Sequence, residues 1–417
     1  MLRAMKPILF TNISLFDGSG KAPYPGEVRV RGNSIDAVAQ RGQQLDRADA
    51  SVIDGKGMTL MPGMVEAHTH LSWPSSVERV INTMMLPAEE HLLVTAQNAR
   101  VTLDHGFTSA YSAGSLGQRF EVALRDMIDA GHIPGPRLRA SSLERGLRES
   151  SQTKGFDETL GVPKSHDTDQ NRNIDELRIY IHEMAALTLD SIKFVLNDAF
   201  APPGSQGLIH SDDEVQAIGE AARKENIWLA CHAQTAGAIK QGVRAGFRAI
   251  FHCTHADEEA LDMMEAKKNE LFTTPAAGLL YARAHEAGLA RGDFLYDSAV
   301  ADLEAFQTLV PQMKKRGIRV LPGGDYGFPY NPVGRNARDL AIFVDLFGYS
   351  PMEALVAATK LGGEMMDMPV GCIKPGYLAD LLLVDGDPTV DVTILQDKAR
   401  IPAVMKDGRF HRAPPQY

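Results

Sequence analysis

Short apolar runs alternate with helix-like segments from residue 59 to 368, and this alternation restricts the fold more than any other feature. Two of the intervening segments open with a capping box, at Ser211 with Glu214 and at Ser350 with Glu353. Alternating strands and helices predict a (β/α)8 barrel of the TIM type, with its active site at the C-terminal ends of the strands. A doubly wound sheet is the competing architecture, although no Gly-rich dinucleotide fingerprint supports it. The eight predicted strands cover residues 64–70, 108–113, 137–141, 191–196, 228–233, 249–253, 271–274 and 319–322.

The two ends of the chain have a different pattern, in which β-like runs are separated by turns. These runs cover residues 8–16, 27–31, 34–39 and 51–54 at one end and 379–384 and 403–407 at the other. We therefore predict a composite β-sandwich domain built from residues 1–58 and 369–417, beside a catalytic barrel of residues 59–368.

The charge balance restricts the partners. The chain has 417 residues, and 43 basic against 53 acidic side chains give a formal charge of −10, which argues against binding to nucleic acid or to an anionic membrane. No run approaches the roughly 20 apolar residues of a membrane span. Cys231, Cys253 and Cys372 are too few for a disulfide framework, so the cytoplasm is the expected compartment. The expected partners are a small-molecule substrate and further copies of the same chain.

His68 and His70 close the first predicted strand and are separated by one residue. Side chains two apart on a strand point to the same face, so the pair forms half of a metal site. Each further candidate alone has an ordinary explanation, such as a core histidine, a salt-bridged lysine or an aspartate that caps a helix. Together they place a residue able to bind metal at the ends of five predicted strands, which chance does not readily produce. The further candidates are Lys193, His232, His252 and Asp325.

The region around the predicted barrel mouth contains further candidates for contact with a substrate. Residues 142–173 form a long polar segment that we interpret as a lid. His255 is interpreted as a loop residue near the pocket. Aromatic side chains suggest a flat or aryl group, although packing is their more common role; they are Trp73, Tyr111, Tyr326, Phe328 and Tyr330. Cationic side chains that would recognise a carboxylate are Arg145, Arg148, Arg283 and His285, of which at least half are expected to face solvent.

Two motifs give the chain a resemblance to the amidohydrolase superfamily over nearly its whole length. Residues 61–70 (MPGMVEAHTH) resemble its first-strand signature, and residues 376–385 (GYLADLLLVD) resemble its return into the small β-domain. The run 250–260 is similar to the branch that contains imidazolonepropionase-like proteins, Xaa-Pro dipeptidases and ochratoxin-cleaving amidases. The resemblance implies the barrel fold and a binuclear metal site.

The resemblance also implies a role for each candidate ligand. His68 and His70 would hold the more buried metal, and His232 and His252 the more exposed one. Lys193, N-carboxylated by CO2, would bridge the two metals. Asp325 would complete the first site and act as general base and acid. Two divalent ions, zinc above all, suit these donors.

The segment that follows Lys193 would line the substrate pocket, through Asn197 and Asp198, but it lacks the Gly-rich sequence of the peptidase members. The expected reaction is hydrolysis of a C–N bond, most simply the amide of an N-acyl amino acid or an aryl amide, by a hydroxide that bridges the metals. An Xaa-Pro dipeptidase and a mononuclear deaminase are the enzymatic alternatives. A non-catalytic assembly scaffold is the alternative from a different class.

Overall fold

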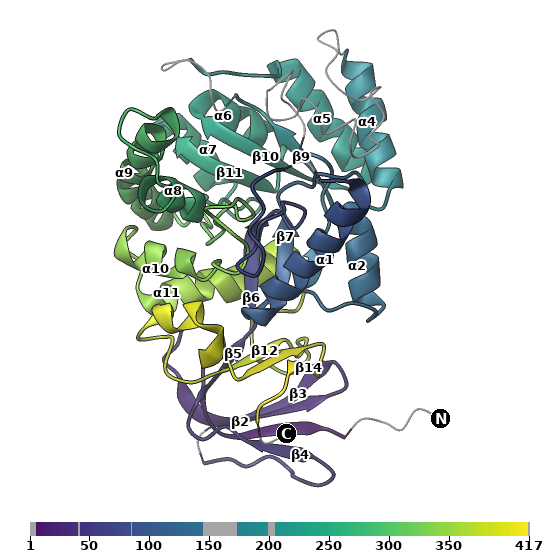
Figure 1. Ribbon diagram of the computed structural model, residues 1–417, viewed down its shortest axis with the longest axis vertical. Helices are drawn as coiled ribbons and strands as arrows, with labels where there is room; N and C mark the ends of the chain where they lie inside the picture. The colour runs from purple at the N-terminus through teal and green to yellow at the C-terminus, as the bar shows by residue number, and fades with distance from the viewer. Residues whose placement is uncertain (1–5, 41, 85, 145–172, 199–204, 416–417) are drawn as a thin grey trace.

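The computed structural model describes residues 6–40, 42–84, 86–144, 173–198 and 205–415. Strands from both ends of the chain lie side by side at one end of the molecule, and the helix-covered α/β body occupies the rest (Figure 1). Most of the predicted lid, residues 142–173, falls outside these described ranges. Among the helices that are described, none is both long and apolar enough to cross a bilayer.

The strands of the two chain ends form one eight-stranded sheet, in the order β14-β13-β12-β5-β1-β2-β3 with β4 on β1. The predicted sandwich is therefore not confirmed, and β5, which we assigned to the barrel, lies inside this sheet. The cause is pairing: β5 runs parallel to β1 and antiparallel to β12, which connects the two ends of the chain. The strands are β1 (Ile8–Leu15), β2 (Tyr24–Arg31), β3 (Ser34–Ala39), β4 (Ser51–Asp54), β5 (Thr59–Pro62), β12 (Leu381–Val384), β13 (Ala403–Lys406) and β14 (Arg409–Arg412).

The middle strands of this sheet are buried on both faces. Leu381 and Leu383 of β12 pack in the core of the sheet itself, whereas Leu382 and Val384 join the core of the α/β body. Side chains alternate between the faces of a strand, so a continuous apolar run fits a strand between two cores. The sheet is thus joined to the α/β body by continuous packing.

The α/β body contains two three-stranded parallel sheets, β6-β7-β8 and β9-β10-β11. The predicted seventh and eighth strands, 271–274 and 319–322, are not regular strands; they form the isolated bridges Ala249–Phe272 and Thr273–Val320. Each ends at a proline, Pro275 or Pro322, which has no N–H for a ladder. The regular sheets therefore do not close. Their strands are β6 (Met64–Thr69), β7 (Phe107–Ser112), β8 (Arg137–Arg139), β9 (Ser191–Val195), β10 (Trp228–Thr235) and β11 (Ala249–His255).

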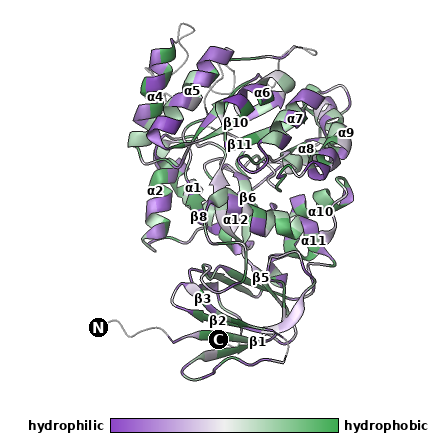
Figure 2. Cartoon of the chain, turned by 180° about the vertical axis from the view of Figure 1, so that it is seen from behind, coloured by the Kyte–Doolittle hydropathy of each residue, from purple (hydrophilic) through white to green (hydrophobic). Residues whose placement is uncertain are grey.

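Helices cover the outside of these sheets, and both predicted capping boxes are confirmed, at Ser211 and Ser350. Hydrophobic colour gathers on the strands of the end sheet, while polar residues mark the outer helices α4 and α5 (Figure 2). The helices are α1 (Ala88–Asp104), α2 (Phe120–Asp129), α4 (Ile174–Ala186), α5 (Asp212–Glu225), α6 (Ala236–Ala245), α7 (Glu258–Ala266), α8 (Ala277–His285), α9 (Phe294–Lys315), α10 (Arg338–Asp345), α11 (Pro351–Val356) and α12 (Gly362–Met366).

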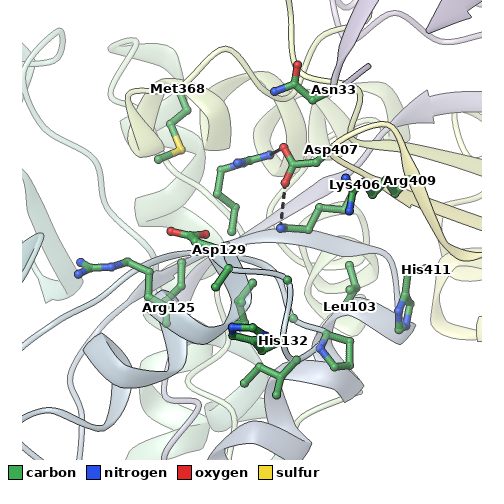
Figure 3. Close-up of a pocket in the computed structure, with 18 of the residues that line it drawn as sticks. Asn33, Leu103, Arg125, Asp129, His132, Met368, Lys406, Asp407, Arg409 and His411 are labelled. Atoms are coloured by element: carbon green, nitrogen blue, oxygen red, sulfur yellow. Dashed lines mark hydrogen bonds and ion pairs between the residues drawn. The ribbon is translucent and has the colours of Figure 1, made fainter. Parts of the chain in front are cut away.

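A hollow of about 1000 Å³ lies where the end sheet meets α2 and β8. Its charged groups pair with one another, which indicates that the hollow lies at the contact between two parts of the fold. Arg137 lies 3.3 Å from Asp380 and 2.6 Å from Asp407, and Lys406 lies 3.1 Å from Asp407. Figure 3 shows the Asp407 carboxylate joined to Lys406 by a dashed line. Ion pairs within the chain thus link the two parts of the fold on this side.

Candidate metal centre

His68, His70 and Asp325 lie together where β6 and the bridge segment 319–322 end. His68 lies on β6, His70 directly after it, and Asp325 follows the bridge segment 319–322. The Nε2 atom of His70 is 3.0 Å from Asp325 Oδ1, and that of His68 is 3.7 Å from the same oxygen. All three residues are buried, and their ligand atoms lie within 4.8 Å of one another, as a shared metal ion requires.

Each of the two histidines makes a hydrogen bond through Nδ1, and the bond of His70 also determines which of its ring nitrogens carries the proton. Nδ1 of His70 is 2.8 Å from the carbonyl oxygen of Gly114, which can only accept, so this nitrogen carries the proton. The Nε2 atom of a neutral His70 then presents a lone pair to Asp325. Two lone pairs at 3.0 Å need a proton or a metal cation between them. Nδ1 of His68 lies 2.8 Å from the hydroxyl oxygen of Thr274, which can donate or accept, so this contact orients the ring without fixing its tautomer.

His232 on β10 and His252 on β11 complete the cluster. Their ring centroids are 4.3 Å apart, and His252 is 5.3 Å from His68. The buried atoms His232 Nε2 and Asp325 Oδ1 accept no hydrogen bond. Buried acceptors without a donor are costly, and a cation satisfies both atoms. The donor set of imidazoles and a carboxylate therefore fits a divalent metal.

Burial keeps three of the clustered imidazoles, those of His68, His232 and His252, neutral. It lowers the pKa of His232 to about 4, with the Lys193 ammonium acting in the same direction. Burial also lowers the pKa values of His68 and His252 well below the usual range, and His232 adds to the effect on both. Because only a neutral imidazole offers a lone pair, these histidines are ready to bind metal at neutral pH.

The backbone is strained at two of these positions. His252 has φ 73° and Asp325 has φ 58°, a left-handed conformation that side chains with a Cβ rarely adopt. Cys253, with φ 59°, continues the irregularity. Strand alternation thus breaks at His252, although Cys231 and Cys253 both pack in the core. Such conformations persist where the surrounding structure fixes a functional geometry.

Lys193 lies on β9 and is completely buried. Its Nζ atom donates to the carbonyl oxygen of Ala113 at 2.7 Å and forms an ion pair with Glu144 Oε1 at 3.0 Å. Burial acts to raise the pKa of Glu144, but the Lys193 ammonium, followed by His70 and His232, outweighs it and the pKa is lowered. Glu144 was not among the predicted site residues, because it lies in the polar segment that we interpreted as a lid. Its position shortly after β8 could have indicated a site residue, because the active site of a barrel lies at the C-terminal ends of the strands.

A cavity of about 170 Å³ lies beside the histidines, and a row of aromatic rings lines it. The ring of Trp73 stacks on that of His70 with centroids 3.9 Å apart, and Phe328 contacts Trp73 edge-on at 4.5 Å. The guanidinium of Arg283 lies 5.9 Å from the Phe328 ring centre. Asp302 of α9 also lines the cavity. The cavity therefore has an aromatic wall with a cation at its far end.

Only some of the predicted substrate residues line the cavity. Trp73 lines the cavity, and the exposed His255 lies 3.8 Å from Asp302 Oδ1, which also lines it. Tyr111 and Tyr326 are fully buried, and neither lines the cavity; Tyr326 donates to Asp339. The remaining two also lie away from the cavity: Asn197 accepts from the backbone N–H of Gln234, and Asp198 bonds through its own N–H to Gly207. Arg145 and Arg148 lie outside the described residues.

The amidohydrolase family matches residues 59–410, so the chain belongs to this family, and the resemblance seen in the sequence is confirmed. Ochratoxinase of Aspergillus niger is 23% identical over 390 residues, which cover 85% of this chain and 76% of that protein. Imidazolonepropionase of Shewanella woodyi is 19% identical, with 96% of this chain and 97% of that protein covered. A solved Xaa-Pro dipeptidase has a TM-score of 0.82 at 23% identity, covers 98% of this chain and 100% of its own, and shows a shared fold.

Proposed function

We propose that the protein is a binuclear, metal-dependent amidohydrolase that cleaves the amide bond of a small N-acyl amino acid or aryl amide. The observation that carries this proposal is the cluster of four imidazoles beside the Asp325 carboxylate, whose Oδ1 atom lies 3.0 Å from Nε2 of His70. The names of the family relatives support C–N hydrolysis. Zinc is the proposed metal, because imidazole and carboxylate donors suit it.

The residues divide into two sets in this proposal. His68, His70 and Asp325 would hold one cation, His232 and His252 the other, and carboxylated Lys193 would lie between them. The cations would supply Lewis acidity, which makes water nucleophilic at neutral pH and polarises the amide carbonyl. Asp325 would accept the proton of the attacking water and pass it to the leaving nitrogen, so that one water and one amide give a carboxylic acid and an amine.

The architecture proposed from the sequence also retains support. The bridge Ser141–Ser191 joins the two parallel sheets, and the bridge Thr69–Tyr326 returns from the last segment to β6. We propose that segments 271–274 and 319–322 complete a (β/α)8 barrel of residues 59–368. The composite end domain of residues 1–58 and 369–417 is the matching proposal, with β5 shared between the two.

The cavity supports a particular substrate shape. Trp73 and Phe328 offer ring faces and edges for a flat acyl or aryl group next to the cluster. Arg283 offers a guanidinium at the far side of that wall, suited to a carboxylate. An N-acyl amino acid has both features, an acyl group at the scissile amide and a free carboxylate beyond it.

Replacing Arg283 with Met is expected to raise the KM for N-acyl amino acids by about 10–100-fold, because a charge-assisted hydrogen bond contributes on the order of 1.5–3 kcal/mol. Methionine keeps most of the side-chain volume. Uncharged anilides should be hydrolysed with an unchanged KM. The measurement is steady-state kinetics on paired N-acyl amino acid and anilide substrates. Equal losses on both substrates would contradict carboxylate recognition.

The overall proposal is tested by metal analysis and a substrate screen. We expect about two divalent ions per chain, complete loss of amide hydrolysis after chelation, and recovery with Zn²⁺. N-acyl amino acids, dipeptides, anilides and carbamates form the screen. One ion per chain with ammonia release from a ring substrate would support the deaminase instead. Full metal loading without turnover on any of these substrates would favour the alternative of a non-catalytic assembly scaffold.

A further inference from the structure

Glu144 occupies a position that the proposed ligand set does not explain. Its Oε1 atom is 3.0 Å from Nζ of Lys193, and its side chain lines the same cavity as the histidines. The electrostatic neighbours of its carboxylate include His70, His232 and Asp325. Glu144, Asp302 and Asp325 are the carboxylates that line the cavity among the described residues, and Asp302 lies apart, beside His255.

The backbone leaves room for this carboxylate. Gly114 has φ +135°, and a Cβ atom there would lie 3.1 Å from Glu144 Cβ and 3.5 Å from Lys193 Cγ. A side chain at this position would therefore crowd both partners. The adjoining carbonyls of Ala113 and Gly114 accept from Lys193 and His70. The end of β7 thus positions Glu144, Lys193 and His70 together.

The charge at this position changes in the proposed active state. Carboxylation joins Nζ of Lys193 to the carbon of CO2 with release of two protons, and it converts the ammonium that faces Glu144 into an anion. A partly buried carboxylate beside a second anion is costly unless a cation replaces the lost one. Two divalent cations would bring four positive charges, against which carboxylated Lys193, Asp325 and the attacking hydroxide would supply three negative ones. A third carboxylate would neutralise the remaining positive charge.

We propose that Glu144 is a further ligand of the metal centre, which pairs with the Lys193 ammonium without metal and binds one of the metals once Lys193 is carboxylated. This proposal rests on the binuclear function proposed above. It assigns the protein a carboxylate donor from the end of β8, in addition to the donors from the other strand ends. The competing interpretation is that Glu144 only neutralises the buried lysine.

The test is metal binding by Glu144→Gln, measured by elemental analysis and by titration of the metal-free protein with Zn²⁺. Glutamine keeps the size and an oxygen that accepts from Lys193, but it has no charge. We expect the weaker of the two metals to bind on the order of 10–100-fold less tightly. The visible absorption of the Co²⁺-loaded protein should change as well, because it reports the ligands of the ion. Asp302→Asn, a carboxylate of the same cavity, is the matched control and should bind metal like the unmodified chain.

A second pair of variants separates a ligand from a mere partner of the lysine. If Glu144 binds metal, Glu144→Gln lowers the affinity further when added to Lys193→Ala in the presence of a short carboxylic acid, which replaces the carboxylate of carboxylated Lys193. An effect that disappears in the Lys193→Ala background would overturn the proposal, as would unchanged affinity in the single variant or an equal loss in Asp302→Asn. In these cases two metals in the unmodified chain would leave the proposed function intact. Absence of metal from the unmodified chain would overturn both.

Discussion

Asp325→Asn should lower kcat by about 10²–10⁴-fold and leave most of the metal bound. The Asp325 carboxylate is buried and faces both His68 and His70, so the isosteric amide keeps an oxygen donor in the same place. An amide cannot take a proton from water at neutral pH, and it cannot return one to the leaving nitrogen. Turnover is measured by release of the amine, and metal content is measured on the same preparation.

Asp339→Asn provides the control for this experiment. Asp339 is also buried near this strand end, but it accepts from the N–H of Gly323 and from the hydroxyl of Tyr326 and lies outside the cluster. Its loss should lower stability and leave turnover per folded molecule nearly unchanged. Near-normal turnover of Asp325→Asn would contradict the role of Asp325 in proton transfer. Loss of all metal would assign Asp325 a purely structural role.

Lys193→Ala should lower metal occupancy from about two ions per chain to one or fewer, with a matching loss of activity. Lys193 is completely buried, so truncation to alanine leaves a space within the protein. A short carboxylic acid, such as acetate or propionate, has the charge and shape of the missing carboxylate and should restore part of both metal content and activity. The readouts are elemental analysis and rate against acid concentration.

Lys267→Ala is the matched control, because Lys267 pairs with Glu270 on the surface at 3.0 Å. This variant should keep its metal and show no response to added acids. Intact Lys193 should also carry the extra mass of CO2 in native mass spectrometry of the metal-loaded chain. Full metal content in Lys193→Ala would contradict a bridging role for this lysine.

The strand positions were well predicted where local sequence sets them. Six of the eight predicted barrel strands appear as regular strands, and each forms a ladder with at least one neighbour. Segments 271–274 and 319–322 form only isolated bridges, and they run into Pro275 and Pro322, which have no N–H for a ladder. The single end sheet, in place of a sandwich, depends on how β5 pairs with β1 and β12, which is a long-range choice.

The metal ligands could be predicted more readily than the residues of the substrate pocket. The spacing of His68 and His70 fixes their common face within one strand. Tyr111 of β7 and Tyr326, which follows segment 319–322, illustrate the opposite case, because both rings pack inside the core. Whether an aromatic ring near a strand end lines the cavity or packs in the core depends on the packing around it.

The sequence by itself determined the family, the order of strands and helices, and the residues at the strand ends, because these follow from local pattern and short-range spacing. Only the tertiary structure decided the Lys193–Glu144 pair, whose members are 49 positions apart, and the stack of His70, Trp73 and Phe328. Contacts between residues distant in the chain depend on how whole elements pack, and that packing sets both the charge and the shape of the cavity.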